Sequence, residues 1–255
     1  MAWERRRNRR VYFRAVKRNG RVYKTYFGCG PVARLAADMD AEERSSRLAR
    51  HQVWIARRAA LQAADDRIKR VRERVDVLVA GHLASHGYYP TRSEWRKRRS
   101  SVADTTPESC PDDLPLLAQR AQQGDLAAQA RLRELMQGSP LLQECGDLAR
   151  HAEAAWVDLI TGGNELFRDG LVARLDQLKA DLAGSAPSRL EQLLVDEIAL
   201  CWLQTQHAAQ LLTGAETAER KEARLAGQRQ ERAHRTYLAA VKQLAVVRKL
   251  LPGSG

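Results

Sequence analysis

The sequence predicts a mainly α-helical protein with a small antiparallel β-sheet at its N-terminus. Alanine, leucine, arginine, glutamate and glutamine dominate the chain, and aromatic residues make up only 5% of it, which is typical of helices. Residues 1–30 differ, because they concentrate the valine, tyrosine and phenylalanine that favour strands. We therefore expect a small basic sheet over 1–30, a long basic helix and a basic-aromatic segment over 31–100, a linker over 101–113, and an all-α bundle over 114–252.

The net positive charge is confined to the first 100 residues of the chain. Residues 1–100 hold 26 Lys/Arg and 10 Asp/Glu, a net charge of +16, whereas residues 101–255 hold 17 Lys/Arg and 21 Asp/Glu, a net charge of −4. The positive charge is densest at Arg5–Arg10 and Arg96–Arg99. Because phosphate is the common polyanion in a cell, this asymmetry predicts that the front of the chain binds nucleic acid.

An Asn-Gly pair predicts a β-hairpin. Asn19-Gly20 separates Val11–Lys17 from Val22–Phe27, and a two-residue type I′ turn needs positive φ at both of its central residues. On one face, such a turn would pair Arg18 with Arg21, Val16 with Tyr23, Arg14 with Thr25, and Tyr12 with Phe27. On the other face, it would pair Lys17 with Val22, Ala15 with Lys24, and Phe13 with Tyr26.

A third strand and a helix are expected to complete this sheet. Ala2–Arg6 can pair with the hairpin by turning at Arg7-Asn8, and Pro31 suits the first turn of the helix that follows. A sheet this small needs a helix on one face to be stable, and either face could receive it. The free face, rich in Arg, Lys and Tyr, would then suit the DNA major groove.

The segment WERRRNRRVYFRAVKRNGRVYKTYFG, with the Ala-rich helix after it, resembles the arm-binding, AP2-like module at the N-terminus of many phage and transposon integrases. The resemblance implies binding of double-stranded DNA through the sheet and, by analogy, a role as a mobile-element accessory factor. The catalytic part of such integrases is not visible: His234-Arg235-Thr236-Tyr237 sets His, Arg and Tyr side by side, whereas a tyrosine recombinase spreads them over a large domain. The whole chain also resembles uncharacterised basic bacterial proteins encoded near mobile elements, which implies no mechanism.

One or two long helices are predicted over residues 32–85, because this range holds no proline and only one glycine, Gly81. A coiled-coil stripe with three- and four-residue spacing runs through Ile68, Val71, Val75 and Leu78. The stripe continues poorly toward Leu48 and Ile55. A helix with so narrow a stripe must pair, either with another helix of the chain or with a second copy.

A second basic cluster follows the long helix. Tyr88, Tyr89 and Trp95 are interleaved with cations, an arrangement in which rings stack on bases while the cations meet phosphates. Ser93 can cap a short helix that presents Arg96–Arg99. The alternative is a charged connector in which Trp95 is a packed anchor.

The rest of the chain predicts a helical bundle for self-association or partner contact. The expected helices are Leu114–Gln123, a helix capped by Asp125 that ends at Gln137, Leu141–Ile160 after Ser139-Pro140, Glu165–Leu182, a helix opened by the capping box Ser188-x-x-Glu191, and Glu216–Leu250. Apolar positions expected to face inward are Leu190, Leu193, Leu194, Ile198, Cys201, Trp202, Thr205, Tyr237, Leu238, Val241, Leu244 and Val247.

No catalytic or metal-binding motif stands out. The sequence lacks a Gly-rich phosphate loop and a G-x-S-x-G elbow, so we expect no enzymatic activity and no cofactor. His82 and His86 share a helix face, but no third ligand lies near them, and a histidine pair at a helix C-terminus is the simpler interpretation. No apolar run approaches a membrane span. The dispersed cysteines predict reduced thiols in a cytoplasmic protein: Cys29, Cys110, Cys145 and Cys201.

The leading hypothesis is a non-enzymatic protein that binds nucleic acid through the basic N-terminal sheet and helix, with double-stranded DNA favoured over RNA. The residues expected to contact it are Arg5, Arg6, Arg7, Arg9, Arg10, Tyr12, Arg14, Lys17, Arg18, Arg21, Tyr23, Lys24, Arg92, Trp95, Arg96, Lys97, Arg98 and Arg99. An RNA-binding protein is one alternative, because basic-aromatic segments also suit single strands and stems. A helical coiled-coil scaffold that binds no nucleic acid is the other.

Overall fold

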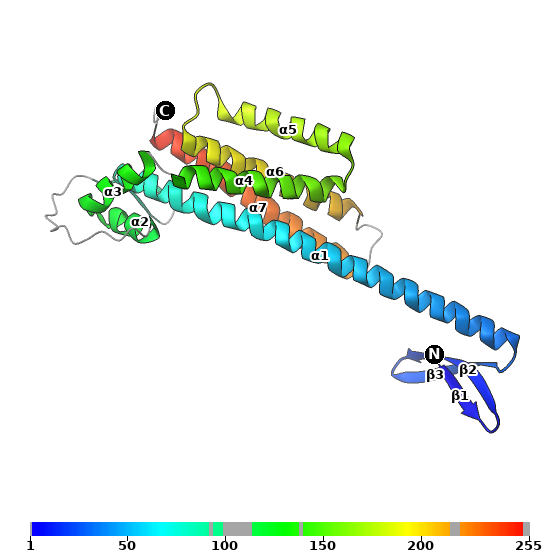
Figure 1. Cartoon of the computed structure of the whole chain (residues 1–255). Coiled ribbons are helices and arrows are strands. Elements are labelled where there is room, and N and C mark those ends of the chain that lie inside the picture. The colour runs from blue at the N-terminus through cyan, green and yellow to red at the C-terminus, as the bar shows by residue number, and fades with distance from the viewer. Residues whose placement is uncertain (1, 92–93, 99–113, 138–139, 215–219, 252–255) are drawn as a thin grey trace. The chain divides into compact units, whose positions relative to one another are not determined.

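A computed structural model describes residues 2–91, 94–98, 114–137, 140–214 and 220–251. Its elements are β1 (Ala2–Arg6), β2 (Arg9–Arg18), β3 (Arg21–Gly28), α1 (Pro31–Ser85), β4 (Tyr88–Pro90), β5 (Trp95–Lys97), α2 (Leu114–Gln123), α3 (Leu126–Gln137), α4 (Pro140–Thr161), α5 (Glu165–Ala183), α6 (Arg189–Gly214) and α7 (Arg220–Leu250) (Figure 1). The predicted fold class is confirmed: a mainly α chain with a small N-terminal antiparallel sheet, a long helix and then C-terminal helices.

The chain forms two compact units, residues 1–60 and residues 61–255, and α1 belongs to both. The later part of α1 therefore packs within the second unit. The predicted linker over 101–113, Ser139 and the expected start of the last helix at Glu216 lie outside the described residues.

The first unit contains a three-stranded antiparallel sheet in the order β1-β2-β3. Asn19 (φ 49°) and Gly20 (φ 78°) both adopt positive φ, as a type I′ turn requires. The predicted register is confirmed from Arg18↔Arg21 to Phe13↔Tyr26, and Ala2–Arg6 forms the predicted third strand.

One predicted pair in this sheet is wrong. Tyr12 lies opposite Gly28 rather than Phe27, because the register shifts between Tyr12 and Phe13. A β-bulge of this kind adds one residue to a strand and bends it. The Tyr12 and Phe27 rings still approach, with centroids 6.2 Å apart, so the predicted aromatic contact survives the change of register.

The first helix begins at Pro31, as predicted, and is continuous to Ser85. Its first two turns pack against the sheet through Ala33 and Ala36, which form a small core with Tyr12. Beyond these turns, every residue from 41 to 60 is exposed. The coiled-coil stripe becomes buried only from Leu61 onward.

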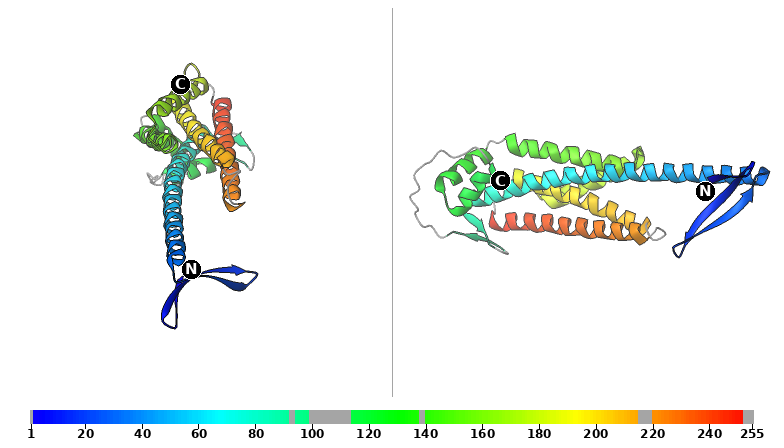
Figure 2. Two further views of the ribbon diagram at one scale, coloured as in Figure 1. Left: turned by 90° about the vertical axis from the view of Figure 1, so that its right-hand side faces the viewer. Right: turned by 90° about the horizontal axis from the view of Figure 1, so that it is seen from below.

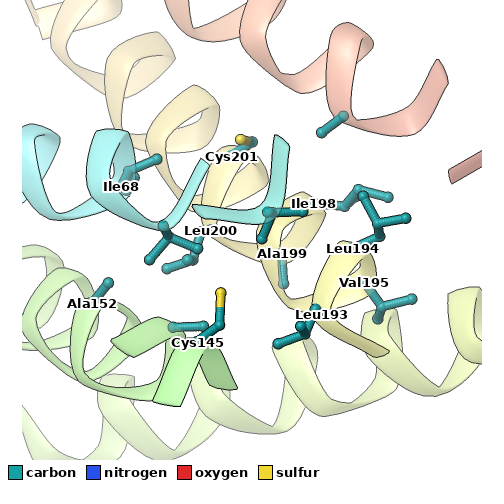
Figure 3. Packing of buried hydrophobic residues seen from close by; sticks show 14 of the residues in the cluster. Ile68, Cys145, Ala152, Leu193, Leu194, Val195, Ile198, Ala199, Leu200 and Cys201 are labelled. Carbon is teal, nitrogen blue, oxygen red and sulfur yellow. The ribbon is translucent and has the colours of Figure 1, made fainter. Parts of the chain in front are cut away.

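The second unit is a helical bundle around one hydrophobic core. Its later segment of α1 lies alongside α4, α6 and α7, while α5 packs on α4 and α6 (Figures 1 and 2). Figure 3 shows Ile68 of α1 in the same cluster as Ala152 and Cys145 of α4 and Leu200 and Cys201 of α6. The Trp156 indole N–H, from α4, donates to the Ala64 carbonyl at 3.1 Å. The stripe of α1 thus pairs with helices of its own chain.

The predicted caps organise this bundle. Asp125 Oδ1 accepts from the amides of Ala127 and Ala128 at 3.0 and 3.1 Å. The Ser188 amide donates to Glu191 Oε2 at 2.8 Å, and the Glu191 amide donates to Ser188 Oγ at 3.3 Å, which confirms the capping box. Leu238 is a correction, because its side chain is 52% exposed on α7 rather than turned inward.

The segment after α1 also differs from its predicted form. Trp95–Lys97 is a strand that pairs with Tyr88–Pro90 rather than a short helix; Ser93 lies outside the described residues. The Thr91 amide and hydroxyl both donate to the Glu94 carbonyl, at 2.7 and 2.6 Å. These bonds connect the two sides of the hairpin, and the aromatic residues Tyr88, Tyr89 and Trp95 favour strands.

Candidate nucleic-acid interface

A buried carboxylate anchors the sheet to α1. The Tyr12 hydroxyl donates to Asp40 Oδ2 at 2.6 Å, and Arg14 donates Nε to Oδ2 at 2.9 Å and Nη2 to Oδ1 at 2.8 Å. Asp40 and Tyr12 are each 2% exposed. The Arg14 guanidinium, hydrogen-bonded to Asp40, holds the pKa of that carboxyl below its ordinary value. The predicted contacts Tyr12 and Arg14 are therefore engaged at the junction between sheet and helix.

This anchor determines which face of the sheet is free. Tyr12 contacts α1, so alternation along the strands places the residues paired as Phe13↔Tyr26 and Ala15↔Lys24 on the opposite face. Arg6 joins this free face from β1, because its Nη2 donates to the Tyr26 hydroxyl at 2.6 Å.

Cations and aromatic rings alternate on the free face. The Arg6 guanidinium carbon lies 4.2 Å from the Tyr26 ring centroid, and Lys24 Nζ lies 4.5 Å from that of Phe13. The two rings are themselves 5.7 Å apart. Cation–π contacts of this kind hold the charged ends over a flat apolar surface.

One acid lies within this basic face. Glu4 Oε2 accepts from the Tyr26 hydroxyl at 3.4 Å and from Lys24 Nζ at 3.5 Å, and Glu4 Oε1 accepts from Arg6 Nε at 3.4 Å. Although burial opposes ionisation, Lys24 and Arg6 together hold the pKa of Glu4 below its ordinary value. Glu4 therefore stays charged at neutral pH and orients both cations. Sequence reasoning did not identify Glu4, Phe13 or Tyr26, because their roles depend on the face they share.

The tip of the β2–β3 hairpin carries unpaired positive charge. The tip cations are exposed, and none of them has a hydrogen-bond or ion-pair partner within the described part of the chain: Lys17, Arg18 and Arg21. Tyr23, two residues after Arg21 in β3, is 56% exposed. These predicted contacts are thus brought together at one accessible end of the sheet.

A second group of predicted arginines gathers at the turn between β1 and β2. The group is exposed and has no acidic partner among the described residues: Arg5, Arg7, Arg9 and Arg10. Arg7 adopts a φ of 52°, a left-handed conformation that is uncommon outside glycine. The chain reverses here, and Arg5 and Arg10 become cross-strand partners.

The exposed part of α1 presents a basic surface; the sequence hypothesis expected the basic helix to contact phosphates but named no individual residue of this segment as a contact. Residues 41–60 hold five arginines and two glutamates. The Arg58 guanidinium lies 5.4 Å from the Trp54 ring centroid, and His51 stacks on the same ring at 6.1 Å. Trp54 is 41% exposed, so this helix segment presents an accessible ring between His51 and Arg58.

The basic cluster after α1 belongs to the second unit, and some of its residues have a structural role. Arg98 donates Nη1 to the Gln123 carbonyl at 2.6 Å and Nη2 to the Gln122 carbonyl at 2.8 Å, which caps the C-terminus of α2. Trp95 is half-buried against the core. Arg96 and Lys97 remain exposed. The predicted contacts Arg92 and Arg99 lie outside the described residues.

No metal centre is formed by the described residues. His82 and His86 have ring centroids 4.7 Å apart, but no group of three or more potential ligands occurs in the described part of the chain. Burial, with a smaller contribution from His86, lowers the pKa of His82 to about 4. No helix among those described is long and apolar enough to cross a membrane.

Comparison of the chain with protein-family profiles, curated proteins and solved structures finds no significant match. Evidence for the function therefore comes from the geometry and charge of the surfaces described above.

Proposed function

We propose that this protein is a non-enzymatic nucleic-acid-binding protein that favours double-stranded DNA, with the N-terminal sheet as its contact surface. The main support for the proposal is that the two faces of the sheet have different surroundings. One face is anchored on α1 through Asp40, and the other presents Arg6 and Lys24 between the rings of Phe13 and Tyr26.

The dimensions of the sheet support a groove-binding mode. The major groove is about 12 Å wide and admits a two-stranded ribbon, and the β2–β3 ribbon extends past the helix-covered part of the sheet to the exposed turn at Asn19-Gly20. In this mode, the cations of the tip meet phosphates or guanine edges, where Arg forms bidentate contacts. The exposed basic segment of α1 supplies further phosphate contacts, and the helical bundle serves partner contact or self-association.

A salt series with charge-removing variants tests this proposal. Binding of the full chain to a labelled random-sequence duplex is measured with and without the double substitution Lys17→Gln/Arg21→Gln. Both side chains are exposed and unpaired among the described residues, so the fold is expected to be unaffected. If each cation neutralises one phosphate, the slope of log K against log salt becomes shallower by about 1.8.

The matched control is Arg150→Gln/Arg235→Gln, which removes two arginines whose side chains in the second unit are 75% and 74% exposed. This control is expected to leave the salt slope unchanged. An equal effect of both double substitutions, or no duplex binding at moderate salt, would contradict the proposal. Structured RNA or single-stranded DNA is added as a competitor; stronger competition by RNA than by duplex would replace the DNA proposal with the RNA alternative.

A further inference from the structure

A shallow surface pocket of about 460 Å³ lies in the first unit, lined by Trp3, Arg9, Arg10, Cys29 and Arg34. These residues come from β1, β2, the connection before α1 and the first turn of α1. The Trp3 ring contacts Tyr12 at a centroid distance of 5.2 Å. Because Tyr12 lies against α1, Trp3 and Arg10 line this pocket from the helix side of the sheet, whereas Arg9, which pairs with Arg6, starts from the opposite face.

The pocket concentrates positive charge without a counter-charge. Arg9, Arg10 and Arg34 are exposed, and no ion pair or hydrogen bond to any of the three side chains is present in the described part of the chain. This contrasts with Arg14, whose charge is matched by Asp40. Three like charges around one hollow repel one another, and an anion bound among them relieves that repulsion.

The chemistry of the lining residues indicates which anion the pocket would bind. Guanidinium groups offer planar pairs of N–H donors that match the oxygens of phosphate. Trp3 is 42% exposed, so its ring offers a flat apolar surface beside the cations. The pocket also adjoins the N-terminal end of α1, where the helix dipole favours negative charge.

We propose that this pocket binds a phosphate group, with Arg34 of α1 and Arg10 of β2 as its ligands. The phosphate can belong to a free phosphomonoester or to a nucleic-acid backbone. The site goes beyond the proposed function, because it lies apart from the free face and would accept phosphate even if the sheet does not bind a duplex. Since its ligands come from both sheet and helix, its occupant would also clamp the junction between them.

Cys29 provides a direct readout of occupancy. It lines the pocket and is exposed, whereas Cys145 and Cys201 are buried. Burial raises the pKa of Cys145 to about 11 and that of Cys201 to about 12, and the thiolate is the reactive form. With Cys110→Ser introduced into the full chain, alkylation by the neutral reagent N-ethylmaleimide therefore reports on Cys29.

The alkylation rate is measured in inorganic phosphate, in a phosphorylated nucleotide and in duplex DNA, each against potassium chloride of equal ionic strength. A probe present at about ten times its dissociation constant is expected to slow the reaction about tenfold. Arg34→Gln should abolish this protection. Arg150→Gln is the matched control, because Arg150 is an arginine of the second unit whose side chain is 75% exposed, and it should retain the protection.

Each outcome either identifies the source of the bound phosphate or rejects the proposed site. Saturable protection by phosphate or the nucleotide that is lost in Arg34→Gln supports a free phosphomonoester ligand. Protection by the duplex alone, lost in Arg34→Gln, supports a backbone phosphate. Protection by the duplex that persists in Arg34→Gln means that DNA covers Cys29 from a neighbouring surface, and the proposal fails. Absence of protection by every probe overturns the pocket, whatever the affinity of the sheet for duplex DNA.

Discussion

At the scale of single residues, a buried carboxylate connects two elements within each unit. Asp40 accepts from both Tyr12 and Arg14, so one carboxylate connects two positions of β2 to α1. In the second unit, Glu197 of α6 accepts from Arg72 Nε of α1 at 3.2 Å. The two carboxylates differ in how fully they are hydrogen-bonded. Both oxygens of Asp40 are bonded, whereas Glu197 Oε2 has no hydrogen-bond partner among the described residues.

Replacing Asp40 should loosen the sheet without unfolding the bundle. Asp40→Ala leaves the buried Tyr12 hydroxyl without an acceptor, and an unsatisfied buried hydroxyl costs about 1–3 kcal/mol. The loss should appear as faster native-state hydrogen exchange of the β2 and β3 amides. Asp38→Ala, at an exposed position on the same helix, is the control. Equal exchange in both variants would show that the anchor contributes little.

Glu197 should make the second unit less stable as the pH rises. Burial, reinforced by Asp76, raises the pKa of Glu197 to about 7, from an ordinary value of 4.5. The folded state therefore binds more protons than the unfolded state between these values, and this contribution to stability is lost as the pH rises through 7.

Glu197→Gln is consequently expected to increase the free energy of unfolding at pH 8 by about 1–3 kcal/mol. It should also reduce the fall in stability between pH 5 and pH 8. Denaturant titrations at several pH values measure both effects. Glu73→Gln removes an exposed carboxylate from α1 and should change neither; a destabilised Glu197→Gln protein at pH 8 would contradict the expected sign.

At the scale of elements, side chains from distant parts of the chain stabilise the ends of helices. Arg133 donates Nε and Nη2 to the Ser85 carbonyl at the end of α1, at 3.0 and 2.7 Å. The Tyr88 hydroxyl donates to the Leu250 carbonyl at the end of α7 at 3.1 Å. Arg98 acts in the same way on α2. Part of the positive charge in this chain thus has a structural role, because helix C-termini attract cations.

Removing the cap at the start of α3 should weaken the α2–α3 pair. Asp125→Ala leaves the Ala127 and Ala128 amides without their acceptor and should cost about 1 kcal/mol in the free energy of unfolding. Asp125→Asn keeps a side-chain oxygen and should cost less. Hydrogen bonds from the Ala128 amide help to lower the pKa of Asp125, so the stability from this cap is lost as the pH falls below its ordinary pKa of 3.8. An equal loss in both variants would argue against a capping role.

At the scale of the whole molecule, a single helix passes from exposed to buried surroundings. Residues 41–60 of α1 are exposed throughout, whereas Ile68, Val71 and Val75 are buried in the bundle. Most helical stability in proteins comes from tertiary packing. The exposed segment should therefore open locally far more often than the rest of α1.

Limited trypsin digestion tests this difference within one helix. The earliest cuts in α1 should fall between Arg44 and Arg58, before any cut between Arg67 and Arg74. Saturating duplex DNA should slow the early cuts if this segment supplies the proposed phosphate contacts. Simultaneous cleavage of both groups of sites without DNA would show that packing does not distinguish the two parts of the helix.

Features that depend on neighbouring residues could be predicted without the structure: the Asn19-Gly20 turn, the start of α1 at Pro31 and the capping box at Ser188. Local backbone preferences and hydrophobic periodicity encode such features directly. In contrast, the free face of the sheet and the arginines that are already paired became known only from the packing of helix on sheet. Asp40 lies 28 residues from Tyr12, and Arg34 meets Arg9 and Arg10 only through the packing of helix on sheet. Long-range partners of this kind leave no mark in local sequence, because they depend on how the elements meet in space.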